Sequence, residues 1–275
     1  MKKNIIWHDY KWKDINTMHL SIRDRAIRFS DGIFETILIK KNRAILFKEH
    51  IKRFNKSLNL LNFKFDLDIE FINKIINEGI SKLSLNEDQV GSIRINYSRG
   101  LNKDRALKIY DSYNEFKINN LWIEFCEIDL NLKPISVNIS QKEKRNEYSV
   151  LSRCKTFSYN QSIQALIEAN TNNFDDALML NTKNELCCGT TFNLLLRRGN
   201  TWLTPRKESG CLSGIMVNQL LKLKLAKEDY LLPIFKEDDI LLAINSLSCK
   251  QIIQIDDLKL KNYFDVQNFW KMLYI

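Results

Sequence analysis

The chain has 275 residues, of which 44% are hydrophobic and 27% charged, and this composition is typical of a globular protein with one large domain or two modest ones. Its formal net charge is +9, but the lysines are scattered and no nucleic-acid-binding motif is present, so we predict no nucleic-acid partner; a basic surface instead suits an anionic small molecule. No stretch approaches the ~20 apolar residues of a membrane helix, and the first residues lack the apolar core of a signal peptide, so we expect a cytoplasmic protein that contacts no membrane.

Hydrophobic periodicity predicts both strands and helices in the first half of the chain. A short buried strand is expected at residues 44–47. Residues 69–83 place apolar side chains at steps of three and four, which is the mark of an amphipathic helix. Residues 93–97 and 121–125 alternate apolar and polar side chains, as half-buried strands do.

The polar stretch 129–134 is the predicted domain boundary, which gives a small α+β domain at 1–130 and a larger α+β domain at 131–275. The second half lacks the regular alternation of strands and helices that a doubly wound sheet requires. Its expected elements are a strand from 135, a helix at 157–170 with Ile163, Leu166 and Ile167 on one face, a strand at 177–180, a hairpin of 192–196 with 201–204, a helix after Gly214, a strand at 240–244 and a closing helix near 264–273.

The six cysteines and three histidines form no pattern typical of a metal site. No two cysteines have C-x-x-C spacing, Cys187 and Cys188 are adjacent, and the histidines are far apart. The G-x-G-x-x-G and P-loop motifs of nucleotide binding are also missing from the sequence. We therefore predict no metal centre, and any chemistry would use lysine, carboxylate or thiol groups or an organic cofactor.

Several separated segments carry residues that suit cofactor chemistry. They are DRAIRFSDGIFET (24–36), HIKRF (50–54), KTFS (155–158), GTTFN (189–193), TP (204–205) and SGCLSGIM (209–216). In combination they resemble the class IV aminotransferase family, the fold-type IV enzymes that use pyridoxal phosphate (PLP). The resemblance covers nearly the whole chain. It implies a two-domain α+β fold with PLP in the interdomain cleft, a PLP-binding role for the domain at 131–275, and a homodimer.

Lys155 matches the family's lysine that forms a Schiff base with the PLP aldehyde and later returns as a base. The neighbouring Cys154 and Phe157 indicate a partly desolvated site, and desolvation favours a neutral amine. The alternative is an exposed lysine without a special role, and only the family context distinguishes Lys155 from the other lysines.

The resemblance also assigns the ligands of the PLP phosphate. Arg53 matches the phosphate-binding arginine, and a guanidinium fork suits phosphate oxygens. The backbone amides of Ile215 and Met216 open a predicted helix, where free N–H groups and the helix dipole attract an anion. Ser246 matches a hydroxyl ligand of the aminotransferases. The alternatives are an exposed helix-face arginine for Arg53 and a turn residue for Ser246.

Arg99 is the predicted substrate-binding residue. Arg99 and Gly100 end the strand at 93–97 and resemble an R-G element near the substrate side of the family. The alternative is a solvated arginine at a strand end.

The sequence departs from the family at two positions. Asn193 matches an Asn of the family's pattern. Five residues before that Asn, the family has a Glu that holds a proton on the pyridine nitrogen of PLP. In this chain Cys188 stands in the place of that Glu. A neutral thiol cannot replace a carboxylate there, and Glu185 would reach the ring only through a bulge. Transamination needs the ring to store an electron pair for longer than elimination does, so we expect Cys188 to disfavour transamination more than lyase chemistry. The second departure is Val217, where the family commonly has a basic residue.

The compact spacing from Lys155 to Asn193 most resembles the aminodeoxychorismate lyases. The predicted function is a PLP-dependent lyase that converts 4-amino-4-deoxychorismate into 4-aminobenzoate and pyruvate for folate synthesis. One alternative is an aminotransferase for branched-chain or D-amino acids, and another is a non-catalytic PLP-binding protein. All three imply a small amine or carboxylate ligand.

Overall fold

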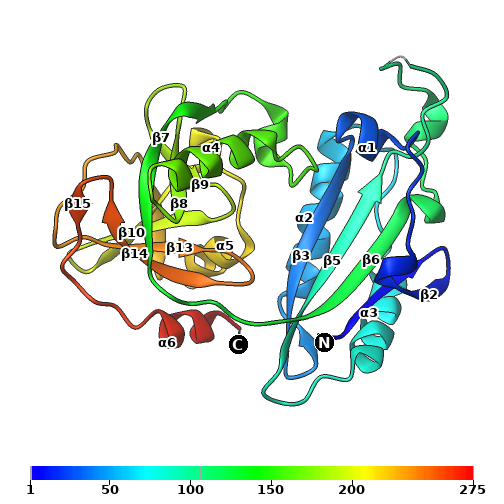
Figure 1. The fold of residues 1–275 in the computed structure, drawn as a ribbon, viewed down its shortest axis with the longest axis horizontal. Helices are drawn as coiled ribbons and strands as arrows, with labels where there is room; N and C mark the ends of the chain where they lie inside the picture. Colours follow the sequence, from blue (N-terminus) through cyan, green and yellow to red (C-terminus); the bar gives the residue numbers. More distant parts are fainter. Residues whose placement is uncertain (1, 106, 275) are drawn as a thin grey trace. The chain divides into compact units, whose positions relative to one another are not determined.

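The computed structural model describes residues 2–105 and 107–274, and it divides into two compact units (Figure 1). The first unit comprises Met1–Leu130 with Cys154–Ser158, and the second comprises Asn131–Arg153 with Tyr159–Ile275. The chain thus leaves the second unit briefly to place five residues in the first. Each unit contains helices and a sheet, so the predicted α+β class is confirmed.

The first unit is an antiparallel sheet with two long helices packed on one face. In the described residues the sheet has six strands in the order β2-β1-β6-β5-β3-β4. Apolar side chains of both long helices and of the central strands share one buried cluster. The elements are β1 (Asn4–His8), β2 (Lys11–Asp14), η1 (Ile15–Thr17), α1 (Arg25–Phe29), β3 (Gly32–Lys40), β4 (Arg43–Ala44), α2 (Phe47–Leu60), α3 (Ile69–Leu83), β5 (Val90–Ser98), η2 (Asp111–Tyr113), η3 (Ile118–Asn120) and β6 (Leu121–Ile128).

Helix α3 confirms the prediction made from its apolar spacing. The Asp68 side chain caps its start by accepting hydrogen bonds from two backbone amides of the first turn. The strand predicted at 44–47 is wrong, because β4 ends at Ala44 and helix α2 begins at Phe47. Leu46 has φ of 52°, so the chain turns there and the apolar run enters a helix instead of continuing along the sheet.

The segment Cys154–Ser158 pairs with the edge of β3 that β4 leaves open. Phe34 N donates to Lys155 O at 2.9 Å, and Phe157 N donates to Gly32 O at 3.0 Å. The predicted boundary at residue 130 put Lys155 in the second domain, and these backbone bonds place it in the first unit instead. Strand β4 pairs only with the far end of β3, at Ile39 and Lys40, so the near end accepts the returning chain.

The second unit is built on a mixed sheet of nine strands, counted over the described ranges. Eight follow the order β12-β11-β10-β13-β14-β7-β8-β9, and β15 pairs with β14. Its elements are β7 (Ile135–Arg145), η4 (Val150–Arg153), α4 (Asn160–Thr171), β8 (Asp176–Asn181), β9 (Leu186–Gly189), β10 (Asn193–Arg198), β11 (Thr201–Pro205), η5 (Lys207–Ser209), α5 (Ile215–Lys222), β12 (Ala226–Asp229), β13 (Ile240–Ile244), β14 (Cys249–Ile255), β15 (Leu258–Lys259), α6 (Val266–Lys271) and η6 (Met272–Tyr274). The predicted hairpin is confirmed as β10–β11, in which Leu196 pairs with Leu203.

Helix α4 lies against β7 and β8 with a face that periodicity did not indicate (Figure 1). Ile163 and Ile167 are about half exposed, whereas Ala165 and Ala169 are fully buried. The buried Glu168 accepts from Ser140 Oγ at 2.7 Å and from the Gln141 amide at 2.9 Å. Its carboxylate thus satisfies the irregular part of β7, and the small alanines allow the helix to approach the sheet.

Within residues 2–105 and 107–274, no helix has the length and apolar character needed to cross a membrane.

Replacing Gly32 by alanine is expected to displace the segment that carries Lys155. A Cβ at this position would lie 2.2 Å from the Phe157 ring and 2.7 Å from the Tyr97 carbonyl oxygen. Overpacking of this kind costs about 1–3 kcal/mol, so Gly32→Ala should unfold at a lower denaturant midpoint than the parent. Thr36→Ala, at a half-buried position on the same strand, is the control and should cost less. An unchanged midpoint for Gly32→Ala would show that the segment is not held as described.

Candidate active site

A buried carboxylate organises the polar centre of the first unit. Glu35 on β3 is fully buried and binds two residues of α2. Arg53 donates to both carboxylate oxygens, from Nε at 2.7 Å and from Nη2 at 2.7 Å. His50 Nδ1 lies 2.7 Å from Glu35 Oε2. The sequence places His50 and Arg53 three residues apart, so both project from one side of the helix toward the strand.

The surroundings keep Glu35 ionised and His50 neutral. Burial raises the pKa of Glu35, but Arg53 and His50 outweigh burial and hold this pKa at about 2. Burial lowers the pKa of His50, and the positive charges of Arg53 and Lys155 lower it further against the effect of Glu35. A neutral His50 therefore donates its Nδ1 proton to the carboxylate, and the guanidinium plane of Arg53 is fixed by a two-point ion pair.

Lys155 lies in a cationic and aromatic environment. Its Nζ is 4.4 Å from the centre of the Phe34 ring, and Arg94 Cζ is 3.7 Å from the centre of the same ring. Phe157 stacks on Phe34 with 6.1 Å between ring centres. The aromatic faces attract both cations, so the first unit gathers Lys155, Arg94 and Arg53 around β3, an arrangement that suits an anionic ligand.

Arg99, the predicted substrate contact, is engaged with the protein itself. Its Nε donates to Asp31 Oδ1 at 3.0 Å, and Nη1 donates to Asn114 Oδ1 at 2.6 Å. Nη2 donates to the Leu61 carbonyl oxygen at 2.9 Å, and the guanidinium lies over Phe63. With 6% exposure, Arg99 ties the end of β5 to its neighbours in this structure. Its substrate-binding role stays a prediction.

Asn193 shapes the turn that precedes helix α5 in the second unit. Its Nδ2 donates to the Leu212 carbonyl oxygen at 2.8 Å. A Cβ on Gly214 would lie 1.9 Å from Asn193 Oδ1, so only glycine allows this close approach. Gly214 is the N-cap and offers no side chain to the first-turn amides, which include those of Ile215 and Met216. The structure thus brings Asn193, Ile215 and Met216 together at a helix start that suits an anion.

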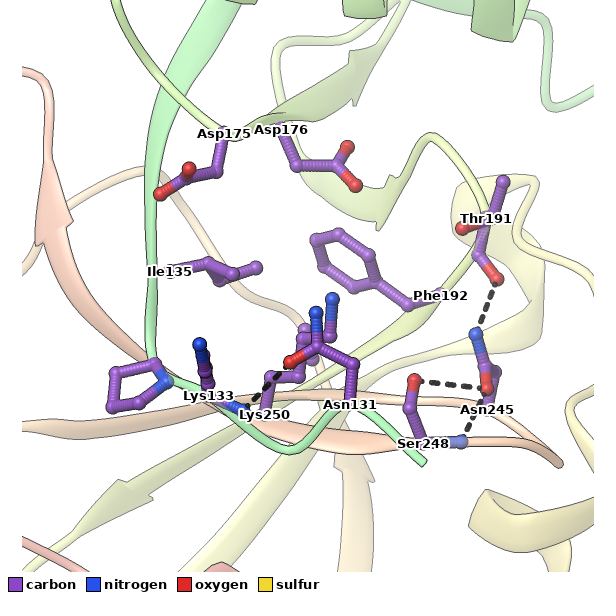
Figure 2. Close-up of a pocket in the computed structure, with 12 residues that line it drawn as sticks. Asn131, Lys133, Ile135, Asp175, Asp176, Thr191, Phe192, Asn245, Ser248 and Lys250 are labelled. Atoms are coloured by element: carbon purple, nitrogen blue, oxygen red, sulfur yellow. Dashed lines mark hydrogen bonds between the residues drawn. The ribbon is translucent and has the colours of Figure 1, made fainter. Parts of the chain in front are cut away.

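Ser246 lies in the β13–β14 turn, which is tied to the segment before Asn193. The Asn245 side chain accepts from the Ser248 amide at 2.8 Å and donates to the Thr191 carbonyl oxygen at 3.3 Å, as Figure 2 shows. The predicted hydroxyl ligand is therefore held on a fixed turn.

A polar cavity of about 330 Å³ adjoins this turn (Figure 2). It contains charges of both signs, from Asp175, Asp176, Lys133 and Lys250. Asp175 Oδ2 accepts from the Ser136 amide at 2.8 Å. None of the predicted site residues lines the cavity; its lining is Asn131, Lys133, Pro134, Ile135, Asp175, Asp176, Thr191, Phe192, Ala243, Asn245, Ser248 and Lys250.

Cys188 on β9 is buried beside Arg145, which comes from the end of β7. Hydrogen bonding from Cys187 lowers the pKa of the Cys188 thiol, and the positive charge of Arg145 lowers it further, whereas burial and Asp176 oppose them. Sequence reasoning treated Cys188 as a neutral thiol, and the neighbouring guanidinium changes that expectation.

Glu185, the carboxylate three residues before Cys188, is bound by residues of the protein. Its Oε2 accepts from Asn181 Nδ2 at 2.9 Å and from Ser209 Oγ at 3.0 Å. Its Oε1 accepts from Arg206 Nη2 at 3.1 Å. All three partners belong to the protein, so Glu185 stabilises the loops beside β9.

Sequence reasoning assigned no role to three residues of these clusters. Glu35 is a charged residue at an inward position of an apolar strand, and that pattern alone could have marked it. Arg94 is also on an apolar strand, and its side chain was assigned to the polar face of that strand. Arg145 ends a long strand and gave no local signal, because its partner is 43 residues away in sequence.

Comparison with known proteins identifies the family. The family model described as amino-transferase class IV matches residues 32–255. The chain therefore belongs to the class IV aminotransferase family, as its motifs predict.

Individual relatives carry more than one kind of name. A protein of Aquifex aeolicus, provisionally named branched-chain-amino-acid aminotransferase, is 25% identical over 88% of this chain and 81% of its own length. An aminodeoxychorismate lyase of Bacillus subtilis is 23% identical over 71% of this chain and 65% of its own length.

Solved structures show the same fold. A crystal structure from Legionella pneumophila, provisionally named 4-amino-4-deoxychorismate lyase, is 24% identical with a TM-score of 0.80 and 94% coverage of both chains. A hypothetical aminotransferase of Mycobacterium tuberculosis in its PLP-bound form is 18% identical, with a TM-score of 0.81 and coverage of 98% of this chain and 97% of that one. The predicted fold-type IV architecture is thereby confirmed.

Removing the charge of Glu35 is expected to destabilise the protein in a pH-dependent way. Because the folded-state pKa of about 2 lies below the ordinary value of 4.5, ionised Glu35 stabilises the fold above pH 4.5, and this stabilisation disappears as the pH falls toward 2. The shift corresponds to about 3 kcal/mol. The difference in unfolding free energy between the parent and Glu35→Gln should therefore be large near pH 7 and smaller at acid pH. Asn86→Ala, at an exposed position of the same unit, removes no ionisable group and should show no such trend. A pH-independent difference for Glu35→Gln would contradict the assignment.

Proposed function

We propose that this protein is a PLP-dependent lyase that converts 4-amino-4-deoxychorismate into 4-aminobenzoate and pyruvate. Membership of the class IV aminotransferase family supports PLP as the cofactor. The observation that carries the proposal is the position of the Lys155 amine, which is held beside Phe34 by backbone pairing with β3. The relatives from Bacillus subtilis and Legionella pneumophila are named for lyase activity.

The groups present in the structure fit the parts of PLP. In the second unit, the amides at the uncapped start of α5 suit its phosphate. In the first unit, Arg53, with its guanidinium plane fixed by Glu35, is the phosphate-binding arginine that the family resemblance assigns. Ser246 is the proposed hydroxyl ligand, and Asn193 positions the turn before α5. When bound, PLP supplies an aldehyde that condenses with amines and a ring that withdraws electrons.

The residues of this chain then have separate roles. Lys155 binds the cofactor, takes a proton from the substrate ring and returns one to the departing pyruvate, and proton transfer by a positioned amine contributes ~10²–10⁴ in rate. The Arg94 guanidinium and the Lys155 amine both lie near the Phe34 ring. Arg94 is proposed to bind a substrate carboxylate. The ring of the product becomes aromatic, and this gain favours elimination. It does so even where the protein only weakly supports a proton on the pyridine nitrogen of PLP.

An aminotransferase for branched-chain or D-amino acids is the second candidate. The relative from Aquifex aeolicus is named for branched-chain transamination, and the fold is common to both activities. The substitution at Cys188 favours the lyase. We also propose a cytoplasmic homodimer, for which the molar mass in solution is the direct measurement.

Borohydride treatment of the PLP-loaded protein should attach the cofactor to Lys155. The peptide that contains Lys155 should gain the mass of the reduced cofactor, and mass spectrometry detects this gain. Lys155→Ala should lose the modification and at least ~10²-fold in turnover, whereas Lys133→Ala should retain both. Modification of a different lysine, or failure to take up PLP, would overturn the proposed site.

The parent should release pyruvate from 4-amino-4-deoxychorismate and transaminate 2-oxoglutarate slowly. Cys188→Glu supplies a carboxylate near the proposed ring nitrogen and should raise transamination more than pyruvate release. Coupled assays of both reactions with parent and variant measure the two ratios. If the parent transaminates as well as Cys188→Glu, the role given to Cys188 is wrong, and turnover with neither substrate would favour a non-catalytic PLP-binding protein.

A further inference from the structure

A β-bulge brings the two adjacent cysteines of β9 into one cluster. Cys188 pairs with Met179 and Leu186 pairs with Leu180, so Cys187 is an extra residue without a counterpart on β8. In a regular strand, neighbouring side chains point to opposite faces, but a bulge re-aims one of them. Cys187 and Cys188 accordingly share a buried cluster with Cys211, and their exposed fractions are 1%, 7% and 7%.

Arg145 supplies the positive charge next to this cluster. Its Nη1 donates to Gln161 Oε1 at 3.2 Å and its Nη2 donates to Ser162 Oγ at 2.8 Å, so the first turn of α4 fixes the guanidinium. Within the part of the chain that the structure describes, no carboxylate forms an ion pair with Arg145.

Arg145 pairs with Asn181 of β8, and Cys188 pairs with Met179 two residues away on the same strand, so the two side chains lie on one face of the sheet. Arg145 is partly buried, and a guanidinium removed from water favours an anion or strong acceptors nearby. Among the ionisable neighbours of Arg145, Cys188 has a larger effect on its pKa than Cys187 or Tyr159.

The other groups that face Cys188 determine which thiol of the cluster ionises. Cys187 donates to Cys188, and its own pKa is raised by that hydrogen bond and by burial. Burial also raises the pKa of Cys211, and the negative charge of Cys188 adds to it. Asp176 on β8 opposes ionisation of Cys188. Of the three thiols, Cys188 is therefore the one whose pKa is lowered, and it is the one whose ionised form Arg145 favours.

We propose that Cys188 and Arg145 form a thiolate–guanidinium pair, and that this pair replaces a carboxylate as the anionic partner of the ring nitrogen of the bound cofactor. The first part concerns the protein alone, whereas the second rests on the proposed function. Cys188 is linked to the start of α5 through Cys211, which shares its buried cluster and stands three residues before the N-cap Gly214. Because the guanidinium of Arg145 partly neutralises the thiolate, the pair supports a proton on the ring nitrogen less strongly than a carboxylate would, and the slow transamination proposed for the parent still follows. Arg145 acts through Cys188 and is a positioning residue.

The first test is a pH titration of thiolate ultraviolet absorbance in cofactor-free, full-length protein under reducing conditions. The parent should show one thiolate step below the ~8.5 of an ordinary cysteine, and Cys188→Ala should abolish it. Arg145→Gln should raise the midpoint by ~1–3 pH units, since a nearby opposite charge lowers a thiol pKa by that amount. Arg145→Lys, which keeps the charge, should restore part of the shift.

Two matched controls separate this pair from general effects. Lys227→Gln removes one exposed positive charge from the same unit and should leave the midpoint unchanged. Cys211→Ala removes another thiol of the cluster and should retain the low step. A parent titration at or above the ordinary value overturns the proposal regardless of how the variants fold, as does an Arg145→Gln midpoint equal to that of the parent.

The second test follows the absorbance band of bound PLP against pH in the parent, Arg145→Gln, Cys188→Ala and Cys188→Glu. If the pair faces the ring nitrogen, Arg145→Gln and Cys188→Ala should each shift the pH dependence of the band. Cys188→Glu should resemble the parent more closely than Cys188→Ala does. A low thiolate step without any spectral change would remove the ring-nitrogen role and leave the pair in place. Failure to bind PLP would instead refute the proposed function, so the two failures are distinguishable.

Discussion

The backbone pairing between residues 154–158 and the start of β3 is the constraint on which the site of the first unit depends. The hydrogen bonds from Phe34 N to Lys155 O and from Phe157 N to Gly32 O fix the Lys155 main chain, so its side chain has a limited region to explore. Gly32 makes the pairing possible because the Phe157 ring occupies the space that a Cβ would need. The amine consequently lies beside Phe34 although the two residues are 121 positions apart in sequence.

Electrostatics then determines what this region can bind. A buried carboxylate such as Glu35 is costly to desolvate, and two ion-pair bonds from Arg53 and one hydrogen bond from His50 offset that cost. The result is a rigid guanidinium on α2 and a concentration of positive charge around β3 with Arg94 and Lys155. Arg99 has a comparable network around Asp31, but its three donor nitrogens all face protein acceptors. Arg53 and Arg99 are thus both held by buried or partly buried carboxylates, Glu35 and Asp31, through different sets of donor nitrogens.

In the second unit, the effect of having Cys188 where the family has a glutamate depends on the residues around it. Replacing a glutamate by cysteine removes a negative charge if the thiol is neutral. The bulge at Cys187 and the neighbouring guanidinium of Arg145 underlie the proposed thiolate, because Cys187 and Arg145 both lower the pKa of Cys188. Glu185, the nearest carboxylate along the chain, is instead bound by Asn181, Arg206 and Ser209.

The sequence by itself determined the family, the α+β class, helix α3 and the β10–β11 hairpin, because these depend on local periodicity, on turn residues or on motifs of contiguous residues. It also identified Lys155, Arg53, Asn193 and the start of α5 as members of one family pattern. Only the tertiary structure decided that Lys155 lies with the first unit, that α4 buries its alanines and Glu168, and that Glu35 and Arg145 are the partners of Arg53 and Cys188. Those features depend on contacts between residues that are far apart along the chain, and a strand edge, a buried charge or a bulge leaves no periodic signal in a single sequence.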